Sequence, residues 1–492
     1  MIDVTSVENM RKSDKYTIEN KTDSLTLMQR AGMGIYKSVK WRGKILVACG
    51  TGNNAGDGYV VAHLLKKAGH KVELVLTEER FSPDGAHYFE MCKAENVPWS
   101  VYNWGLLEGY DMIVDCVLGT GFIGEPIGAV KELIEAINQS GAYVVSADIN
   151  SGLNGDSGIG TCSVESDLTV SIGSYKAGHY LGQAKDKIWE LTNVDIGIGL
   201  IDPPYKLLEK QDVKKFFRKR KNFSNKGTYG YISLIGGSVQ YGGAMKLANL
   251  SASAMRAGAG VVRLCVPNEI VGSVSPHLIE STLYPLSSQN GCVKFCENEI
   301  QGAINGSKAI AIGMGLGQGG ENERIIEYVL KSSTVPVIID ADGLNTLAEM
   351  DVSLISHASC PVVLTPHLKE MERLCGTSMS EILKNPIKHA VSYAKKTGAT
   401  VLLKGPTTVI TDGETVYLSS TGCAGMATAG SGDVLSGIIA ALCASCTDIL
   451  LCTAVGAFIN GLAGEMAQEE YGDISMVASD TARYIAKAIK SL

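Results

Sequence analysis

Two glycine-rich loops that each lead into a helical pattern carry the residues of this sequence best suited to chemistry. The first loop is Gly50-Thr51-Gly52-Asn53-Asn54-Ala55-Gly56-Asp57-Gly58, directly after the apolar run 44–49. Its glycines allow a tight turn against a ligand, and N–H groups at a helix start accept phosphate oxygens. The spacing of Gly50, Gly52 and Ala55 also fits a dinucleotide fingerprint, with Glu78 as the ribose acid. The loop predicts a nucleotide site and leaves open an NAD dehydrogenase or a turn without a ligand.

Two more polar loops follow strand-like runs in the first half of the chain. They read Asp115-Cys116-Val117-Leu118-Gly119-Thr120-Gly121-Phe122 and Asp148-Ile149-Asn150-Ser151-Gly152-Leu153-Asn154. Because the carboxyl ends of parallel strands meet at one edge of a sheet, we expect these loops to converge with the first. Asn54, Asp115 and Ser151 would offer oxygen ligands to a hard cation, and Asp148 could move a proton. Each residue by itself is also a common turn former or helix cap.

The second glycine loop, Ala429-Gly430-Ser431-Gly432, runs into a helix predicted from Asp433. The N–H groups of Gly430 to Asp433 would form an anion cradle, favoured by the helix dipole. A carboxylate there could take the proton from a hydroxyl that attacks a phosphoryl group. The alternative is that Asp433 only stabilises the start of the helix. The motif Gly-x-x-x-x-Gly-Lys-Ser/Thr does not occur in the sequence, which excludes a P-loop enzyme.

Two polar segments upstream of this loop follow strand-like runs. Lys404-Gly405-Pro406-Thr407-Thr408 precedes a hairpin predicted to turn at Asp412-Gly413, a place where a nucleotide could rest. Thr365-Pro366-His367 lies close to Glu370 and Glu372. We interpret His367 as a polar contact rather than a base.

The elements that must position these loops alternate between short β-rich runs and longer helical ones. In the first half we expect strands at 44–49, 71–77, 112–117, 143–147 and 168–172, and helices at 58–68, 83–96 and 130–139. In the second half, strands are expected at 229–235, 260–266, 309–312, 336–339, 362–364 and 400–403. A helical block follows from 433 to 492, with one strong interruption near 471–473. This alternation predicts an α/β fold of two three-layer αβα domains with parallel sheets.

A dense basic run at 212–221 separates the two halves. We interpret it as a solvated linker, with a nucleic-acid or nuclear-targeting patch as the alternative. The boundary is placed near residue 215, which gives domains 1–215 and 216–492.

Composition excludes several classes of protein. The 492 residues are 45% hydrophobic and carry a net charge of −7, which argues against disorder and against nucleic-acid or membrane partners. The dispersed cysteines number 13, an odd count that predicts reduced thiols and a cytoplasmic location. The N-terminus lacks the pattern of a signal peptide. The apolar run 449–464 is short for a membrane span and predicts a buried helix.

The first half resembles the epimerase domain of NAD(P)H-hydrate repair enzymes. The matching motifs are Gly52-Asn53-Asn54-Ala55-Gly56-Asp57-Gly58, Gly119-Thr120-Gly121, the segment 148–154, and Tyr175-Lys176-Ala177-Gly178-His179-Tyr180-Leu181-Gly182. The resemblance implies a Rossmann-like domain that interconverts the R and S epimers of hydrated NADH or NADPH with a bound potassium ion. Two positions depart from the family pattern: Ala55 replaces the usual glycine and Asn150 the usual proline.

The same resemblance implies the residues of the epimerase site. Asp148 would be catalytic, and the potassium ligands would be Asn54, Asp115 and Ser151. The hydrate would be held by Asn53, Asn54, Ala55, Gly56, Asp57, Gly119, Thr120, Gly121, Phe122, Ile123, Gly124, Glu125 and Asp148.

The second half resembles the ADP-dependent NAD(P)H-hydrate dehydratase of the ribokinase-like superfamily. The motifs are the segments 225–230, 236–238, 256–260, 340–345, 365–367 and 425–433. The resemblance implies ADP as cosubstrate, with magnesium. The adenine nucleotide would be held by Lys404, Gly405, Pro406, Thr407, Thr408 and Gly432, and the hydrate by Ala259, Gly315, His367 and Asp433. Leu368-Lys369-Glu370 departs from the usual Pro-Gly-Glu.

The resemblance implies metabolite repair by a bifunctional isomerase and lyase. Asp433 would deprotonate the C6 hydroxyl of the S-hydrate, and ADP would yield AMP and phosphate. The expected partners are small molecules, with no nucleic acid or membrane, and a homo-oligomer is expected. The alternatives are a sugar or vitamin-precursor kinase fused to a Rossmann module, a non-catalytic first half, and an NAD dehydrogenase, which leaves the second half without a role.

Overall fold

The first sheet is built from seven strands in the order β4-β3-β2-β5-β6-β7-β9, each parallel to its neighbours. Their bounds are β2 Lys44–Cys49, β3 Lys71–Leu76, β4 Trp99–Val101, β5 Met112–Cys116, β6 Tyr143–Ala147, β7 Ser166–Ile172 and β9 Ile188–Val194. The chain winds outward from β2 in both directions, so the strand order reverses beside β2. Loops leaving β2 and β5 diverge at this point and create the crevice in which such sheets bind ligands.

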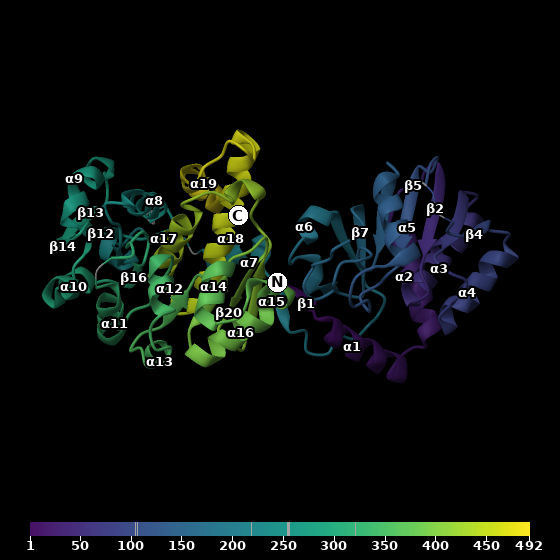
Figure 1. Cartoon of the computed structure of the whole chain (residues 1–492), viewed down its shortest axis with the longest axis horizontal. Coiled ribbons are helices and arrows are strands. Elements are labelled where there is room, and N and C mark those ends of the chain that lie inside the picture. The colour runs from purple at the N-terminus through teal and green to yellow at the C-terminus, as the bar shows by residue number, and fades with distance from the viewer. Residues whose placement is uncertain (104, 106, 218, 253–255, 320) are drawn as a thin grey trace. The chain divides into compact units, whose positions relative to one another are not determined.

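Helices cover both faces of this sheet (Figure 1). Alternate residues of β2 contribute to two separate apolar clusters, one with Ile45 and Val47 and the other with Leu46 and Ala48. Helices α2 to α4 pack in the first cluster and α5 in the second, which gives three layers. The helices of this unit are α1 Val7–Asn20, α2 Ser24–Ser38, α3 Asn53–Lys67, α4 Pro83–Ala94, α5 Gly128–Gln139 and α6 Ala184–Lys187. A short parallel pair joins β1 (Ile2–Thr5) to β8 (Tyr175–Lys176).

The second sheet runs in the order β13-β12-β11-β16-β17-β18-β19-β20-β21-β10. Its strands are β10 Tyr205–Leu207, β11 Tyr231–Ile235, β12 Val261–Pro267, β13 Thr282–Leu286, β16 Ala309–Ile312, β17 Val337–Ile339, β18 Val362–Leu364, β19 Thr400–Leu403, β20 Thr408–Thr411 and β21 Val416–Ser419. The strands from β13 to β19 are parallel, whereas β20 is antiparallel to both neighbours. The hairpin predicted at Asp412-Gly413 is therefore confirmed between β20 and β21. A separate antiparallel pair joins β14 (Ser288–Gln289) to β15 (Cys292–Val293).

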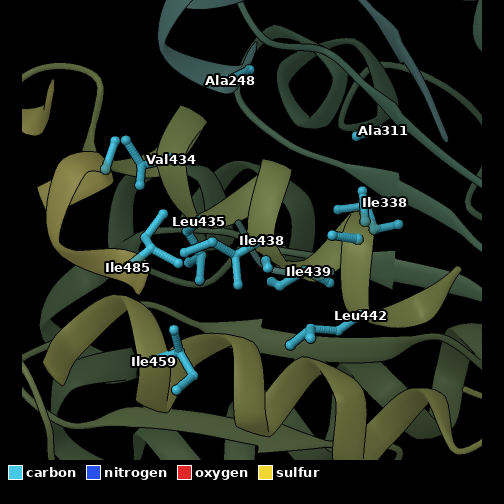
Figure 2. Packing of buried hydrophobic residues seen from close by; sticks show 14 of the residues in the cluster. Ala248, Ala311, Ile338, Val434, Leu435, Ile438, Ile439, Leu442, Ile459 and Ile485 are labelled. Atoms are coloured by element: carbon cyan, nitrogen blue, oxygen red, sulfur yellow. The ribbon is translucent and has the colours of Figure 1, made fainter. Parts of the chain in front are cut away.

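The core of the second unit centres on α17 (Ser431–Cys443), whose residues from Val434 to Cys443 are all buried. A helix that is apolar on every side is stable only when surrounded by protein. Figure 2 shows its isoleucines and leucines between Ile338 of the sheet, Ile459 of α18 (Ile449–Tyr471) and Ile485 of α19 (Ala478–Lys490). This packing holds the N-terminus of α17 and Asp433 in place. The remaining helices are α7 Lys210–Phe216, α8 Gly242–Ala252, α9 Val271–Val274, α10 Glu297–Ile304, α11 Asn322–Ser332, α12 Asp342–Leu347, α13 Ser353–Ser356, α14 Leu368–Cys375, α15 Met379–Lys384 and α16 Pro386–Thr397.

These descriptions come from a computed structural model that describes residues 1–103, 105, 107–217, 219–252, 256–319 and 321–492. The chain divides into two units, one of Asp3–Tyr205 and one of Met1–Ile2 with Lys206–Leu492. The sequence places the division at 215, ten residues later, because the basic run suggests a linker. In the structure, Lys210–Phe216 forms α7, and its buried Val213 joins the core of the second unit. Arg218 of that run lies outside the described residues.

Most expected elements are present, with two differences. The helix expected at 58–68 begins at Asn53, so the polar residues of the first glycine loop form its opening turn. The helical block contains a second interruption, at 444–448, in addition to that between α18 and α19. The buried helix predicted in the apolar run is part of α18, which is long and apolar enough for a membrane span, yet 67% of its apolar window is buried in the fold.

Candidate active sites

A cavity of about 830 Å³ lies at the carboxyl ends of β2, β3, β5 and β6. A volume of this size suits a small-molecule ligand. The first glycine loop, the loop after β5 and helix α1 all contribute to its wall. The site residues expected from the sequence that line it are Asn53, Asn54, Asp57, Gly119, Thr120, Gly121, Phe122 and Asp148.

Five other residues expected to hold the hydrate do not line this cavity. Ala55 is 2% exposed and packs in the apolar cluster around β2, and Gly56 lies against Met28 of α2. Both face inward because the helix begins at Asn53 rather than after the loop. Residues 123–125 follow the lining segment, and the side chain of Ile123 is 80% exposed.

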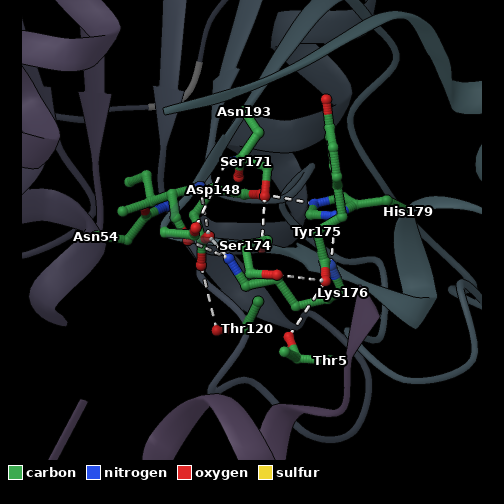
Figure 3. A network of polar contacts seen from close by, with 12 residues as sticks. Thr5, Asn54, Thr120, Asp148, Ser171, Ser174, Tyr175, Lys176, His179 and Asn193 are labelled. Atoms are coloured by element: carbon green, nitrogen blue, oxygen red, sulfur yellow. Dashed lines mark hydrogen bonds and ion pairs between the residues drawn. The ribbon is translucent and has the colours of Figure 1, made fainter. Parts of the chain in front are cut away.

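Asp148 is held at the cavity by a buried network drawn in Figure 3. The ammonium of Lys176, whose side chain is 1% exposed, pairs with the Asp148 carboxylate and donates to the Ile172 carbonyl over 2.8 Å. Thr120 Oγ1 donates to Asp148 Oδ2 over 3.2 Å. Burial raises the pKa of Asp148, but the Lys176 charge outweighs it and holds that pKa below its usual value. Asp148 is therefore an ionised carboxylate at the wall of the cavity.

His179 fixes the backbone around this carboxylate. Burial, together with the Lys176 charge, lowers the pKa of His179 to about 4, so its ring is neutral at pH 7. The Lys176 amide donates to Nδ1 over 3.0 Å, which leaves the ring proton on Nε2. Nε2 lies 2.7 Å from the Asp148 carbonyl and donates to it. Asp148 has a φ of 63°, and such left-handed backbone at a non-glycine residue clusters at functional sites.

Two further carboxyl groups share the cavity with Asp148, and sequence reasoning missed one of them. Asp14, on α1, was not expected at the site. Burial raises the pKa of Asp14 to about 6. Burial, with the charges of Asp148 and Asp14, raises the pKa of Asp57 well above its usual value. The cavity therefore combines one carboxyl group whose pKa is lowered with two whose pKa values are raised, an arrangement suited to paired acid and base chemistry.

The three expected cation ligands meet around Leu118. Asn54 Nδ2 donates to the Leu118 carbonyl over 2.9 Å, and the Leu118 amide donates to Ser151 Oγ over 2.7 Å. Ser151 Oγ donates to Asp115 Oδ1 over 2.5 Å. Asn54 Oδ1 is buried and finds no hydrogen-bond partner among the described residues. Burial raises the pKa of Asp115 despite hydrogen bonds from Ser151, Ser146 and Val117, which are all uncharged groups. An orphaned amide oxygen beside a buried carboxylate fits a bound cation.

The departure at Asn150 has a structural role. Its amide nitrogen donates to the carbonyls of Val164 and Lys187 and to Ser166 Oγ, at 2.9 to 3.0 Å. Thr169 Oγ1 donates to its amide oxygen over 2.5 Å. The side chain is fully buried and satisfied, so it ties the loop after β6 to β7 without entering the cavity.

The second site forms around the start of α17. Gly430 has a φ of 92° and turns the chain into the helix, where the first N–H groups lack intrahelical acceptors. Burial and the charge of Asp340 raise the pKa of Asp433 to about 7, although Lys404 opposes this. A carboxylate with such a pKa is matched to general-base work near neutral pH.

A chain of buried charges connects the neighbouring strand ends. Asp340, directly after β17, accepts from Lys404 Nζ over 2.9 Å and from Ser436 Oγ over 2.8 Å. Lys404 Nζ also lies 3.7 Å from Glu370 Oε2. Burial raises the pKa of Glu370, and the Lys404 charge limits that rise. Asp340 and Glu370 thus stand beside the expected nucleotide-binding Lys404, and Ser436 is hydrogen-bonded to Asp340. The sequence places Asp340 in a matching motif and Glu370 near His367, but it does not predict these contacts.

His367 caps α14 rather than acting as a free base. Its Nδ1 accepts from the amides of Lys369 and Glu370 at 3.0 and 3.2 Å. Nε2 therefore carries the ring proton and lies 3.4 Å from Glu370 Oε1. Burial, with the Lys404 charge, lowers the pKa of His367. The replaced Leu368-Lys369 pair forms the first turn of α14. The interpretation of His367 as a polar contact for the ligand stays a prediction.

The other residues expected at this site lie in different surroundings. In the segment 404–408, Gly405 and Pro406 are exposed, Thr408 opens β20, and Thr407 Oγ1 is buried without a hydrogen-bond partner among the described residues. Gly432 lies beside Asp340 and Lys404. Gly315 faces Tyr241 and Ala244 near the start of α8. Ala259 is 3% exposed and packs in the core, so only its backbone could face a ligand.

Charged residues whose partners the sequence analysis did not identify share one signal. Lys176, Asp340 and Lys404 are charged residues at the ends of apolar strands or in the segments that follow them. A charge in such a buried place needs a partner, and each strand end supplies one. The partners come from other strands, and for that reason spacing along the chain does not reveal them.

Comparison with known families covers both units. Residues 232–487 match the family model described as NAD(P)H-hydrate dehydratase. Residues 24–178 match the model described as YjeF-related protein N-terminus. Asp14 and Arg11 of the first cavity lie before the matched range.

Relatives match along nearly the whole chain. The bifunctional NAD(P)H-hydrate repair enzyme Nnr of Coxiella burnetii is 32% identical over 484 residues, which cover 96% of both chains. The protein of the same name from Archaeoglobus fulgidus is 34% identical over 474 residues, 94% of both chains. The crystal structure of an ADP/ATP-dependent NAD(P)H-hydrate dehydratase from Bacillus subtilis, co-crystallised with ATP and Mg²⁺, superposes with a TM-score of 0.50 and 27% identity. It covers 58% of this chain and 98% of its own.

Proposed function

This chain belongs to the family of bifunctional NAD(P)H-hydrate repair enzymes, and we propose that it returns hydrated NADH and NADPH to the reduced cofactors in two steps. The first unit interconverts the R and S hydrates. The second unit dehydrates the S-hydrate with ADP and magnesium, which gives AMP and phosphate. The observation that carries the proposal is the pairing of two separate acid–base sites, at Asp148 and at Asp433, in one chain.

In the dehydratase site, Asp433 takes the proton of the C6 hydroxyl. The resulting alkoxide attacks the terminal phosphoryl group of ADP, and the P–O bond to AMP breaks. The ring nitrogen lone pair then expels phosphate from C6, and loss of a proton from C5 restores the ring double bond. Lys404 lies where its charge would stabilise the phosphoryl oxygens, and the α17 N-terminus would bind them.

In the epimerase site, Asp148 acts as the base toward the hydroxyl on C6. The ion pair with Lys176 lowers the pKa of Asp148 and thereby keeps this carboxylate ionised. The lining residues Asn53, Asp57, Gly119, Thr120, Gly121 and Phe122 would surround the hydrated ring and its phosphates.

Potassium would bind at Asn54, Asp115 and Ser151. The orphaned Asn54 Oδ1 and the buried Asp115 carboxylate fit a cation held by amide, carboxylate and hydroxyl oxygens. The charge it would supply offsets the cost of burying Asp115 and orders the loop after β5.

The test is recovery of the near-ultraviolet absorbance of reduced nicotinamide from a mixture of R and S hydrates, with ADP, magnesium and potassium. Full recovery is expected, and replacement of potassium by a bulky organic cation is expected to slow only the R fraction. If absorbance recovers only in proportion to the S-hydrate, the second unit is active and the first unit is not. Accumulation of a phosphorylated small molecule from ATP, with no recovery from hydrates, would favour the kinase alternative.

We also propose that the enzyme works in the cytoplasm as a homo-oligomer and acts on small molecules alone. All 13 cysteines are free thiols in the structure, which suits a reducing compartment. Sedimentation of the purified chain at several concentrations measures the oligomeric state.

A further inference from the structure

Asp340 is a buried carboxylate of the second unit with a hydrogen bond on each of its two oxygens. It is 1% exposed, and its two oxygens accept from different partners, Lys404 on Oδ1 and Ser436 on Oδ2. The next residue, Ala341, has a φ of 51°, so the chain turns sharply at the end of β17. Left-handed backbone at alanine is strained and persists only where surrounding structure requires it. The fold therefore places this carboxylate at a defined position.

The Asp340–Lys404 pair lies directly against the residue that precedes Asp433. A Cβ atom added to Gly432 would lie 3.2 Å from Asp340 Oδ2 and 3.4 Å from Lys404 Nζ. Ser436, which donates to Asp340, lies one turn along α17 from Gly432. The pair is thus held against the first turn of the helix, between the end of β17 and the end of β19.

Three carboxylates act on the single ammonium group of Lys404. Asp340, Glu370 and Asp433 all act to raise the pKa of Lys404, which ends above its usual value although burial opposes this. The contact with Asp340 is the closer one, at 2.9 Å against 3.7 Å for Glu370. An ammonium held by Asp340 is not available to neutralise the Asp433 carboxylate fully.

We propose that Asp340 is a positioning residue of the dehydratase site, which holds the Lys404 ammonium beside Gly432, so that the Lys404 charge offsets the Asp433 charge only in part and Asp433 remains basic enough to take the hydroxyl proton. This inference rests on the proposed dehydratase activity. Asp340 itself is not the base, because both of its oxygens are occupied and the Lys404 charge, offsetting its burial, holds the pKa of Asp340 below its usual value. The charge of Asp340 is a cause of the raised pKa of Asp433.

The test compares the pH dependence of S-hydrate dehydration in the parent and in Asp340→Asn. The substitution removes a negative charge from the neighbourhood of Asp433 and frees Lys404 to pair with it. We expect the acid limb of the kcat profile to move down by about one pH unit and the plateau kcat to fall about tenfold, because a weaker base transfers the proton less well. If the acid limb of the kcat profile of Asp340→Asn lies at the same pH as in the parent, the proposal is overturned.

Two more variants separate charge from structure. Ser436→Ala removes a hydrogen bond from the same Asp340 oxygen without changing any charge, so its acid limb should coincide with that of the parent. Lys404→Gln should move the limb in the opposite direction, upward, because it removes the positive charge near Asp433. Lys404→Gln also keeps the proposal falsifiable if Asp340→Asn does not fold, since a downward or absent shift would contradict it.

A direct titration distinguishes this inference from the proposed function. Aspartate carboxyl carbons labelled with ¹³C report the Asp433 pKa by NMR without any turnover, with Asp433→Asn for assignment. A parent that fails to dehydrate hydrates, while the Asp433 signal still shifts in Asp340→Asn, would refute the function and leave the positioning role. An active parent whose Asp433 signal does not shift in the variant would refute the positioning role alone.

Discussion

Buried lysine–aspartate pairs are the residue-scale feature that the two sites share. Lys176 pairs with Asp148 in the first unit, and Lys404 pairs with Asp340 in the second. In the first site the paired aspartate is the proposed base, which the lysine keeps ionised. In the second site the paired aspartate, Asp340, is not the proposed base. It lies near Asp433 and holds the Lys404 ammonium in an ion pair. The same type of buried ion pair therefore has opposite consequences in the two sites. The pKa of Asp148 is lowered by its own lysine, whereas the pKa of Asp433 stays raised beside the Lys404–Asp340 pair.

Asp433→Asn should remove the dehydratase base and little else. We expect turnover of the S-hydrate to fall by at least about 10²-fold, the usual range for loss of a general base, while ADP binds with near-normal affinity. Turnover is followed by nicotinamide absorbance and ADP affinity by calorimetry. Loss of ADP binding with turnover retained would contradict the assignment of Asp433 as the base.

The same substitution should change stability in a pH-dependent way. The pKa of Asp433 is 3.8 in the reference state and about 7 in the folded chain, so the folded state binds this proton more tightly. The cost of ionising Asp433 is therefore absent at low pH, grows as the pH rises through this interval and is complete above about 7. Asp433→Asn removes that cost. Its free energy of unfolding, from urea titrations, should exceed the parent's at about pH 8 and approach it near pH 4; a difference independent of pH would contradict this.

At the scale of elements, helix starts set the chemistry of both sites. The first five residues of α3 carry Asn53, Asn54 and Asp57 into the first cavity, and the first turn of α17 carries Gly432 and Asp433 into the second site. Each helix begins directly after a glycine: Gly430, before α17, has a φ of 92°, whereas Gly52, before α3, has a φ of −92° and is not required by the backbone. The side chains that follow then lie within the first turn, where the helix dipole favours anions.

Gly430→Ala should damage the second site more than its backbone cost alone predicts. Gly430 has a φ of 92°, and a Cβ there would lie 2.3 Å from Leu247 Cδ1, so either the Leu247 side chain or the start of α17 must shift. Gly472, at the end of α18, has a φ of 78° and open space around the same position. Gly472→Ala therefore isolates the left-handed backbone cost, about 1 kcal/mol.

We expect both variants to lose thermal stability and only Gly430→Ala to lose dehydratase activity, by about tenfold or more. Activity and melting temperature are measured on the same preparations. Equal activity in the two variants would show that the position of the α17 start does not limit catalysis.

At the scale of the whole molecule, each activity has its own apolar core. The apolar clusters around β2 contain no residue of the second unit, and the cluster around α17 none of the first, among the described residues. Substitutions in one site should therefore leave the other activity unchanged, since distant independent sites behave additively.

Paired single variants test this independence. Asp148→Asn should abolish recovery from the R-hydrate and leave S-hydrate dehydration within about twofold of the parent, by the additivity of separate sites. Asp433→Asn should leave conversion between R and S intact, as followed by chromatography of the two epimers. A loss of both activities in either variant would indicate that the units depend on each other.

The sequence by itself determined the α/β class, most of the strands, the hairpin at Asp412-Gly413 and the glycine loops, because these depend on local periodicity and on residues that must turn or cap. It also placed Asn54, Asp148 and Asp433 at strand and helix ends. Only the tertiary structure decided which charges meet. Asp14 reaches the first cavity from α1, and the Asp340–Lys404 pair forms between strands 64 residues apart along the chain. Such contacts follow from strand order and helix docking, which bring distant segments together, and local patterns do not encode those distances.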